Sequence, residues 1–164
     1  FIYLYNIWIE GIEMLSNFKS IIIATLLSTF LFGREYIAIV DFDAVGISIS
    51  EVRALTQRLT TEMISLEVYQ VLERAEMKRL LDEQKFQYSD CVNLKCAIEI
   101  GKMIEARYIV VGSISKLGTI YSIDSRIINV ETGEIENTGV YDHTGDIGGL
   151  LTEGMMRVAI ELIK

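Results

Sequence analysis

The clearest alternation of apolar and polar positions lies between Cys96 and Glu136. At its start, three apolar residues recur at three- and four-residue spacing, which places them on one face of a helix: Ala97, Ile100 and Ile104. Gly101 lies on the same face, where the missing side chain lets the helix backbone approach a neighbouring element. This part of the chain therefore predicts a short helix that packs closely on another element.

Two strands are predicted directly after this helix. Residues 107–116 are rich in Ile and Val, which favours a strand over a second helix. After a break at 117–119, apolar and polar residues alternate, Tyr121, Ile123 and Ile127 against Ser122, Asp124 and Arg126. A period of two is typical of a strand with one face in water. We expect a helix laid across an antiparallel hairpin.

The residues before the helix predict one strand, one helix and then a second strand and helix. Residues 36–42 are a continuous apolar run typical of a buried strand, and 44–49 are expected to form a loop. Ser48 and Glu51 have the spacing of a capping box, which opens a helix. Its apolar stripe comprises Val52, Leu55, Leu59, Met63 and Leu66. A short strand at 69–72 precedes a helix marked by Met77, Leu80 and Leu81.

The C-terminal residues predict one more strand and one more helix. The strand covers 140–143, and Asp146 is expected to cap a helix with the stripe Leu151, Met155, Val158 and Leu162. The element order is then β-α-β-α-α-β-β-β-α. It predicts an α/β (α+β) fold of three layers, a mixed sheet of about five strands with helices on both faces. The β-α-β start implies parallel strands joined by a right-handed crossover, and the later hairpins are antiparallel.

Composition restricts the fold and the partners. A chain of 164 residues has room for one domain, and 12 Gly with no Pro argues against linkers or disorder. The formal net charge of −8 disfavours nucleic acid and anionic membrane surfaces, which need a basic face. One histidine and two cysteines leave little material for a metal site. We therefore expect no cofactor and no metal.

The first thirty-three residues are expected to lie outside the folded domain. Met14 has the context of a start, followed by Lys19 and an apolar run at 21–32. As a helix this run is about 18 Å long, against roughly 30 Å for a bilayer core, and it suits a secretory signal peptide. An uncleaved N-terminal anchor is the alternative and would be the chain's one membrane contact. Residues 1–33 are then upstream residues plus signal peptide or anchor, and 34–164 a single domain.

Asp41 and Asp43 are the one candidate pair of catalytic residues. With Val45 they form a D-x-D-x-V pattern after a buried strand, similar to the opening motif of haloacid-dehalogenase-like phosphotransferases. There, one Asp is the nucleophile, the other a general acid, and Mg²⁺ binds with the phosphate. The further acidic pair and the lysine of that machinery are missing from the sequence. Two interpretations remain, an acidic strand end and a Mg²⁺-dependent phosphohydrolase, and the first is favoured.

Three other polar features have structural interpretations. Cys91 and Cys96 favour a structural disulfide if the protein is exported, and two free thiols if it is cytosolic. His143 has no nucleophile and carboxylate at a fixed spacing that would indicate a hydrolase triad. Glu73 and Arg74 are expected to form an ion pair, either buried or solvated.

Four segments together resemble the CsgG family, that of the curli production assembly/transport component. They are IAIVDF (37–42), VLERAEMKRLLDEQKFQ (71–87), CAIEIGKMIEARYIVVGSISKLG (96–118) and YSIDSRIINVETGEI (121–135). The resemblance extends over about 36–164 and includes LpoB-like and TolB amino-terminal-like relatives. It implies a protein of the bacterial periplasm or cell envelope, with no catalytic residues known for the domain.

The chain differs from the curli channel in two respects. It has no lipobox cysteine after the apolar run, and 34–164 has no segment to spare for long membrane-inserting hairpins. The resemblance therefore implies an exported, non-enzymatic accessory domain that binds a protein or an envelope component and does not form a pore. A ring-forming structural subunit, hence a homo-oligomer, is the alternative that needs no catalysis.

Overall fold

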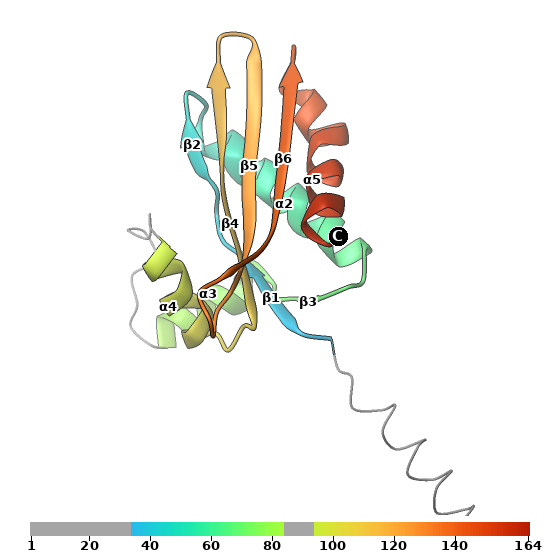
Figure 1. The fold of residues 1–164 in the computed structure, drawn as a ribbon. Coiled ribbons are helices and arrows are strands. Elements are labelled where there is room, and N and C mark those ends of the chain that lie inside the picture. Colours follow the sequence, from blue (N-terminus) through green and yellow to red (C-terminus); the bar gives the residue numbers. More distant parts are fainter. Residues whose placement is uncertain (1–33, 84–93) are drawn as a thin grey trace, which may run out of the picture. The chain divides into compact units, whose positions relative to one another are not determined.

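The computed structural model describes residues 34–83 and 94–164 (Figure 1). The predictions for residues 1–33 and for Cys91 lie outside these ranges. Six strands are found: β1 (Tyr36–Ile39), β2 (Asp43–Val45), β3 (Gln70–Val71), β4 (Tyr108–Leu117), β5 (Ile120–Asn129) and β6 (Ile135–Thr144). The helical elements are α2 (Ile49–Ser65), α3 (Arg74–Glu83), α4 (Leu94–Met103), a π-helical turn η3 (Leu150–Gly154) and α5 (Met155–Leu162).

The strands form one mixed sheet, as predicted. Its order is β3-β1-β4-β5-β6, with β2 paired to the other end of β4. Strand β1 is parallel to both β3 and β4, and the two hairpins β4–β5 and β5–β6 are antiparallel. The sheet has six strands and not about five, because Ala44 and Val45, expected in a loop, pair with Ile114 and Ser115. A three-residue strand carries too little periodicity to be recognised in a sequence.

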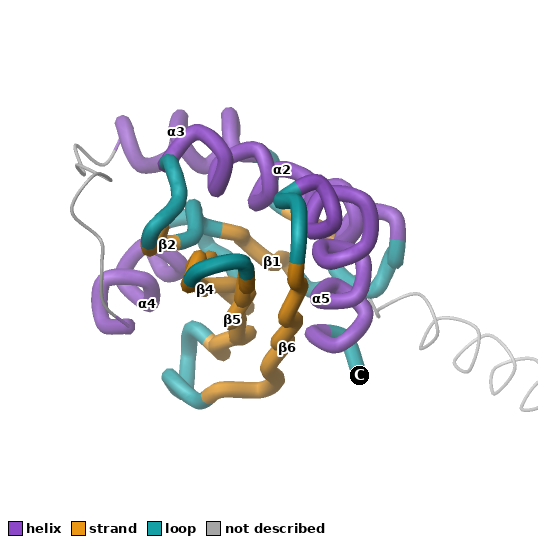
Figure 2. The backbone as a smooth tube through the Cα atoms, turned by 90° about the horizontal axis from the view of Figure 1, so that it is seen from above, coloured by secondary structure: helices purple, strands orange, loops and turns teal. Residues whose placement is uncertain are grey.

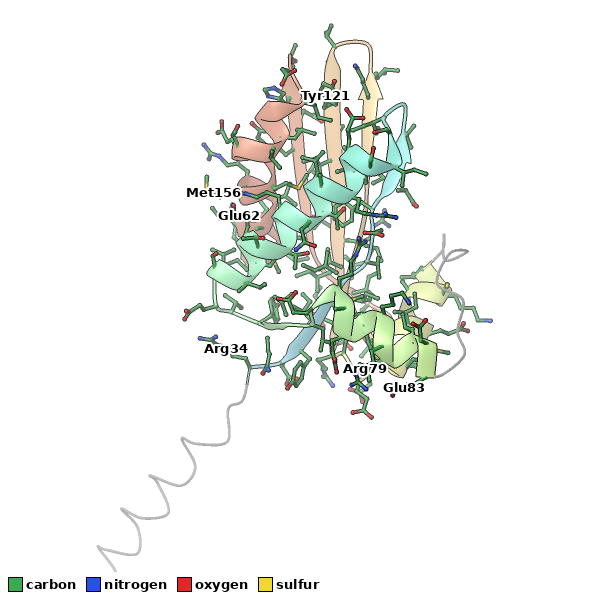
Figure 3. All side chains as sticks on the ribbon, turned by 180° about the vertical axis from the view of Figure 1, so that it is seen from behind. Arg34, Glu62, Arg79, Glu83, Tyr121 and Met156 are labelled. Carbon is green, nitrogen blue, oxygen red and sulfur yellow. The ribbon has the colours of Figure 1, made fainter. Side chains whose placement is uncertain are left out.

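Helices cover both faces of the sheet, which confirms the three-layer prediction. On β1, Ile37 and Ile39 join the core under α2 and α5, whereas Ala38 between them joins the core under α3 and α4. On β4, Val110 likewise joins the core under α2 and α5, and Ile109 joins the core under α3 and α4. Figure 2 shows α2 and α5 along one side of the strands, and Figure 3 shows them from that side, with α2 crossing the sheet.

Helix α2 begins at the predicted capping box. The Ser48 side chain accepts a hydrogen bond from the Glu51 N–H, and the Glu51 carboxylate accepts one from the Ser48 N–H. The Ser48 hydroxyl also donates to the Glu51 carboxylate, and this hydrogen bond, together with that from the Ser48 N–H, holds the pKa of Glu51 below its ordinary value. The buried face of the helix consists mainly of the predicted stripe, Val52, Leu55, Leu59 and Met63.

Helix α4 confirms the close approach expected at Gly101. A Cβ built on this glycine would lie 2.4 Å from Cγ2 of Val130, in the strand-end segment after β5. Only a residue without a side chain permits this spacing. None of the helices within 34–83 and 94–164 has the length and apolarity to span a membrane.

The C-terminal helix differs from its prediction by one residue. Leu151, expected in the buried stripe, is 45% exposed, and Leu150 is buried in its place. The reason is the π-helical turn: the N–H of Met155 bonds to the carbonyl of Leu150, five residues back. This wide turn aligns Leu150 with Met155, Val158 and Leu162, which are all buried. Asp146 acts before the helix, where its carboxylate accepts a hydrogen bond from Gly148 N–H.

Candidate functional site

Asp41, the first residue of the D-x-D pattern, is held by arginines. Its carboxylate forms an ion pair with Arg74, the first residue of α3, and lies 3.8 Å from Nε of Arg53 on α2. The Asp41 side chain is 28% exposed, so the pairing is partly shielded from water. Asp41 thereby links the end of β1 to two helices.

The ion pair predicted between Glu73 and Arg74 is not formed, because Arg74 pairs with Asp41 instead. In the described part of the chain, Arg74 reaches Asp41, and no ion pair joins it to Glu73. Sequence adjacency suggested the wrong partner, because the pairing depends on how β1 and α3 meet in the fold.

Asp43, the second residue of the pattern, lies on an exposed strand. It is the first residue of β2, opposite Ser113 of β4, and the buried Phe42 separates it from Asp41. Across 34–83 and 94–164, no three His, Cys, Asp or Glu side chains gather to hold a metal ion. The two aspartates are therefore not joined by the further acidic ligands that the phosphohydrolase hypothesis needs.

The other residues singled out in the sequence lie apart from these aspartates. Cys96 is on α4 and packs against the second core, while Cys91 lies outside the described residues, so their disulfide stays a prediction. His143 is on β6, opposite Tyr121 of β5, and its ring lies against Gly149. Neither is brought together with Asp41 or Asp43.

A shallow depression of about 400 Å³ lies at the end of the sheet where α2 begins. Its lining includes Gly46, Ser48, Glu51, Lys116 and Tyr121. Figure 3 places Tyr121 at the end of the domain far from Arg34. The Lys116 Nζ is 5.1 Å from the centre of the Tyr121 ring, and interactions with Tyr121, Glu51 and Asp146 raise its pKa above the ordinary value. The cation is thus already engaged by the protein's own groups.

One surface of the sheet has no evident internal role among the described residues. We name it the open face. It consists of alternate residues of four adjacent strands: Asp43 and Val45 of β2, Ser113, Ser115 and Leu117 of β4, Ile120, Ser122, Asp124 and Arg126 of β5, and Thr138, Val140 and Asp142 of β6. Their registers place them in cross-strand rows, because alternate residues share one side of a strand. One row runs from Asp43 through Ser113 and Asp124 to Val140, and the next from Val45 through Ser115 and Ser122 to Asp142.

No helix of the described residues covers the open face. Nearer the other end of the same strands, the same side of the sheet is covered, since Ile109, Ile128 and Val130 pack with α3 and α4. Figure 1 views the uncovered part from the front, with α2 behind the sheet. On this side of the sheet, the helical layer of α3 and α4 thus covers one half of the strands, and no described helix covers the other half.

The open face combines small polar residues with exposed apolar ones. Its three serines are half-buried and short, so the centre is nearly flat, and Ser122 Oγ donates a 2.5 Å hydrogen bond to Asp142. Around them Val45, Leu117 and Val140 are 55%, 82% and 50% exposed. A flat surface of this kind suits contact with another macromolecule and offers no enclosure for a small substrate.

The sequence indicated part of the open face. The alternation along 121–127 predicted that Ser122, Asp124 and Arg126 face water, and Asp124 and Arg126 are exposed. It gave no sign that β2 extends this surface, since Asp43 is seventy residues from Ser113 in sequence. The pairing of β2 with β4 is the information that sequence reasoning lacked.

Comparison with known families gives one match. Residues 42–125, half of the chain, match the family model described as curli production assembly/transport component CsgG. The match begins at Phe42 and ends in β5, so it includes β2 and β4. A comparison with curated protein sequences gives no match.

Solved structures with a similar fold have little sequence identity to the chain. The LpoB C-terminal domain from Escherichia coli has a TM-score of 0.57 at 15% identity, over 73% of this chain and 93% of that one. A PelC dodecamer from Paraburkholderia phytofirmans gives 0.52 at 14%, over 79% and 85%. TolB from Acinetobacter baumannii gives 0.51 at 12%, over 78% of this chain and 27% of that one. These likenesses confirm the predicted relatives at the level of the fold.

Proposed function

The chain belongs to the CsgG family, and from this premise we propose that it is a non-enzymatic accessory domain of the bacterial cell envelope that binds a protein partner through the open face. The observation that carries the proposal is the uncovered sheet half, where Val45, Leu117 and Val140, from three of its four strands, are exposed around a flat polar centre. Apolar side chains that lie exposed together on one surface are typical of protein interaction sites.

Export and lack of catalysis are parts of the same proposal. The apolar run at 21–32 supports export as a signal peptide or anchor, and family membership supports the envelope as the compartment. The pairing of Asp41 with Arg74 and Arg53 supports a structural role for the residue that a phosphohydrolase would use as nucleophile. An envelope component other than a protein is the neighbouring alternative for the partner.

Catalysis is tested directly at Asp41. We expect no Mg²⁺-dependent hydrolysis of para-nitrophenyl phosphate by the full chain above the level of an Asp41→Asn variant. The reason is that two guanidinium groups already occupy this carboxylate. Hydrolysis by the wild type that Asp41→Asn and Asp43→Asn each abolish, with folding retained by circular dichroism, would replace the proposal with a phosphohydrolase.

Partner binding is tested by site-specific photo-crosslinking in the source bacterium. We expect benzoylphenylalanine at Ser115, in the centre of the open face, to give a discrete heteromeric product. The control position is Lys95 on α4, which is exposed but lies far from the open face. Products from Lys95 with none from Ser115 would contradict the open face as the binding surface.

Ring formation is the second candidate function, and one likeness favours it. The PelC structure of similar fold is described as a dodecamer, although its 14% identity supports the fold alone. In a ring, benzoylphenylalanine at some surface positions would crosslink neighbouring copies of the chain and give a series of homo-oligomeric products. Size-exclusion chromatography with light scattering on the purified chain separates the two functions. An accessory domain elutes as a monomer, whereas a ring elutes at a multiple of the chain's mass.

A further inference from the structure

The chemistry of the open face indicates which kind of partner it fits. We propose that the partner is a basic amphipathic helix of another protein, which lies across the open face and completes the missing helical layer. This inference rests on the proposed function and adds the charge and form of the bound segment. Three observations carry it: the layer pattern, the charges of the face, and the charges of the rest of the chain.

The layer pattern indicates a helix. Where helices cover the sheet, α2 and α5 lie on one side and α3 and α4 on the other. From the row of Arg126 to the row of Ile120, the open face measures about 20 Å along the strands and about 15 Å across its four strands. A helix of about four turns fits this length, and the short serine side chains at its centre permit close approach.

The charges of the face indicate a basic segment. Asp43, Asp124 and Asp142 are exposed on three of its strands, with Arg126 as the single cation. Asp43 and Asp124 lie two strands apart in one row, about 10 Å, separated only by Ser113. No ion pair within 34–83 and 94–164 neutralises any of these three carboxylates. Lysine or arginine side chains would satisfy them, and the surrounding Val45, Val140 and Leu117 would contact the apolar residues of the same helix.

The described residues of a second copy of this chain do not supply such a segment. Within 34–83 and 94–164, every arginine except Arg126 pairs with a carboxylate of its own domain. The lysines without such an ion pair are Lys95, Lys102, Lys116 and Lys164, and no helix there carries more than two of them. The chain as a whole has a net charge of −8, so two copies facing each other here would bring like charges together. An anionic lipid surface is disfavoured for the same reason. The basic helix therefore belongs to a different protein.

The test uses a synthetic probe, since the natural segment is unidentified. The probe is a fluorescein-labelled leucine–lysine amphipathic helix of about 15 residues, long enough for the face. We expect the full chain to bind it in fluorescence anisotropy, and to show little binding of the leucine–glutamate counterpart. Affinity should fall steeply between low and physiological salt, because exposed charge pairs are screened.

The decisive comparison is between two triple variants with the same change in net charge. Asp43→Asn/Asp124→Asn/Asp142→Asn should weaken binding about tenfold, the combined effect of three exposed ion pairs. The matched control neutralises exposed carboxylates away from the open face, Glu35→Gln/Glu99→Gln/Glu134→Gln. It should change the affinity less than twofold.

Each remaining outcome contradicts the inference. Equal losses in both triple variants would mean that the probe responds to net charge and not to the open face. Tighter binding of the acidic probe would mean that the charge argument is wrong. Crosslinks from Ser115 to an acidic or neutral partner, or to a second copy of the chain, would overturn the basic helix. A foreign partner of any charge would still leave the proposed function standing.

Discussion

Replacing Gly112 with valine is expected to lower the free energy of unfolding by roughly 3 kcal/mol, at the upper end of the usual cost of overpacking. A Cβ at Gly112 would lie 2.5 Å from the backbone oxygen of Asp124 and 2.7 Å from Cε2 of Phe42. The first of these atoms belongs to the paired strand β5, so it can move only if the β4–β5 ladder is distorted. Valine adds two further methyl groups to this conflict.

Urea denaturation followed by far-ultraviolet circular dichroism measures the effect. Ser115→Val is the matched control, since it introduces the same residue into the same strand on the uncovered side of the sheet. It should shift the unfolding free energy by about 0.5 kcal/mol or less, as for most surface substitutions. Equal stability of the two variants would show that strand β4 accommodates a side chain at Gly112.

Truncating Phe42 to alanine is expected to cost about 3–5 kcal/mol. The Phe42 side chain is 5% exposed and belongs to the core under α2, and its ring closes against Gly112. Its backbone N–H also donates to Oγ1 of the buried Thr56, at 3.4 Å, which ties this residue to α2. Removal of the ring leaves a cavity between the helix and the sheet that the paired strands cannot fill by collapsing.

Tyr36→Ala is the control for Phe42→Ala, because Tyr36 is an aromatic residue of β1 that is 43% exposed. Its cost should be about 1 kcal/mol in the same denaturation experiment. If Phe42→Ala unfolds at the same urea concentration as Tyr36→Ala, the ring does not support the core as described. A Phe42→Leu variant, which retains most of the apolar contact, should fall between the two.

The sequence was sufficient to predict those helices and strands whose apolar periodicity repeats several times. Helix α2 shows this best, since its capping box at Ser48 and a stripe of four spaced apolar residues define both its start and its buried face. Strand β5 has a full set of alternations, so the buried Tyr121, Ile123 and Ile127 were identified correctly. Local pattern and tertiary packing agree in these segments, and the prediction needed no knowledge of the neighbours.

The candidate site was harder to predict from the sequence, because its properties arise from pairings between distant segments. Asp41 and Asp43 were found as a motif, but the arginines that bind Asp41 come from α2 and α3. The open face exists because β2 joins β4 while α3 and α4 stop short of it. No local pattern encodes where a helical layer ends, so the alternation along β5 predicted a surface exposed to water and not the size of that surface.

The π-helical turn before α5 affects how this chain should be aligned with its relatives. A turn of five residues per hydrogen bond holds one residue more than an α-helical turn, and here it keeps Leu150 and Met155 on the same side of the helix. A relative with uninterrupted α-helix in this position presents the same buried face with one residue fewer. An alignment through 150–154 without a one-residue gap would therefore pair buried positions of one protein with exposed positions of the other along all of α5.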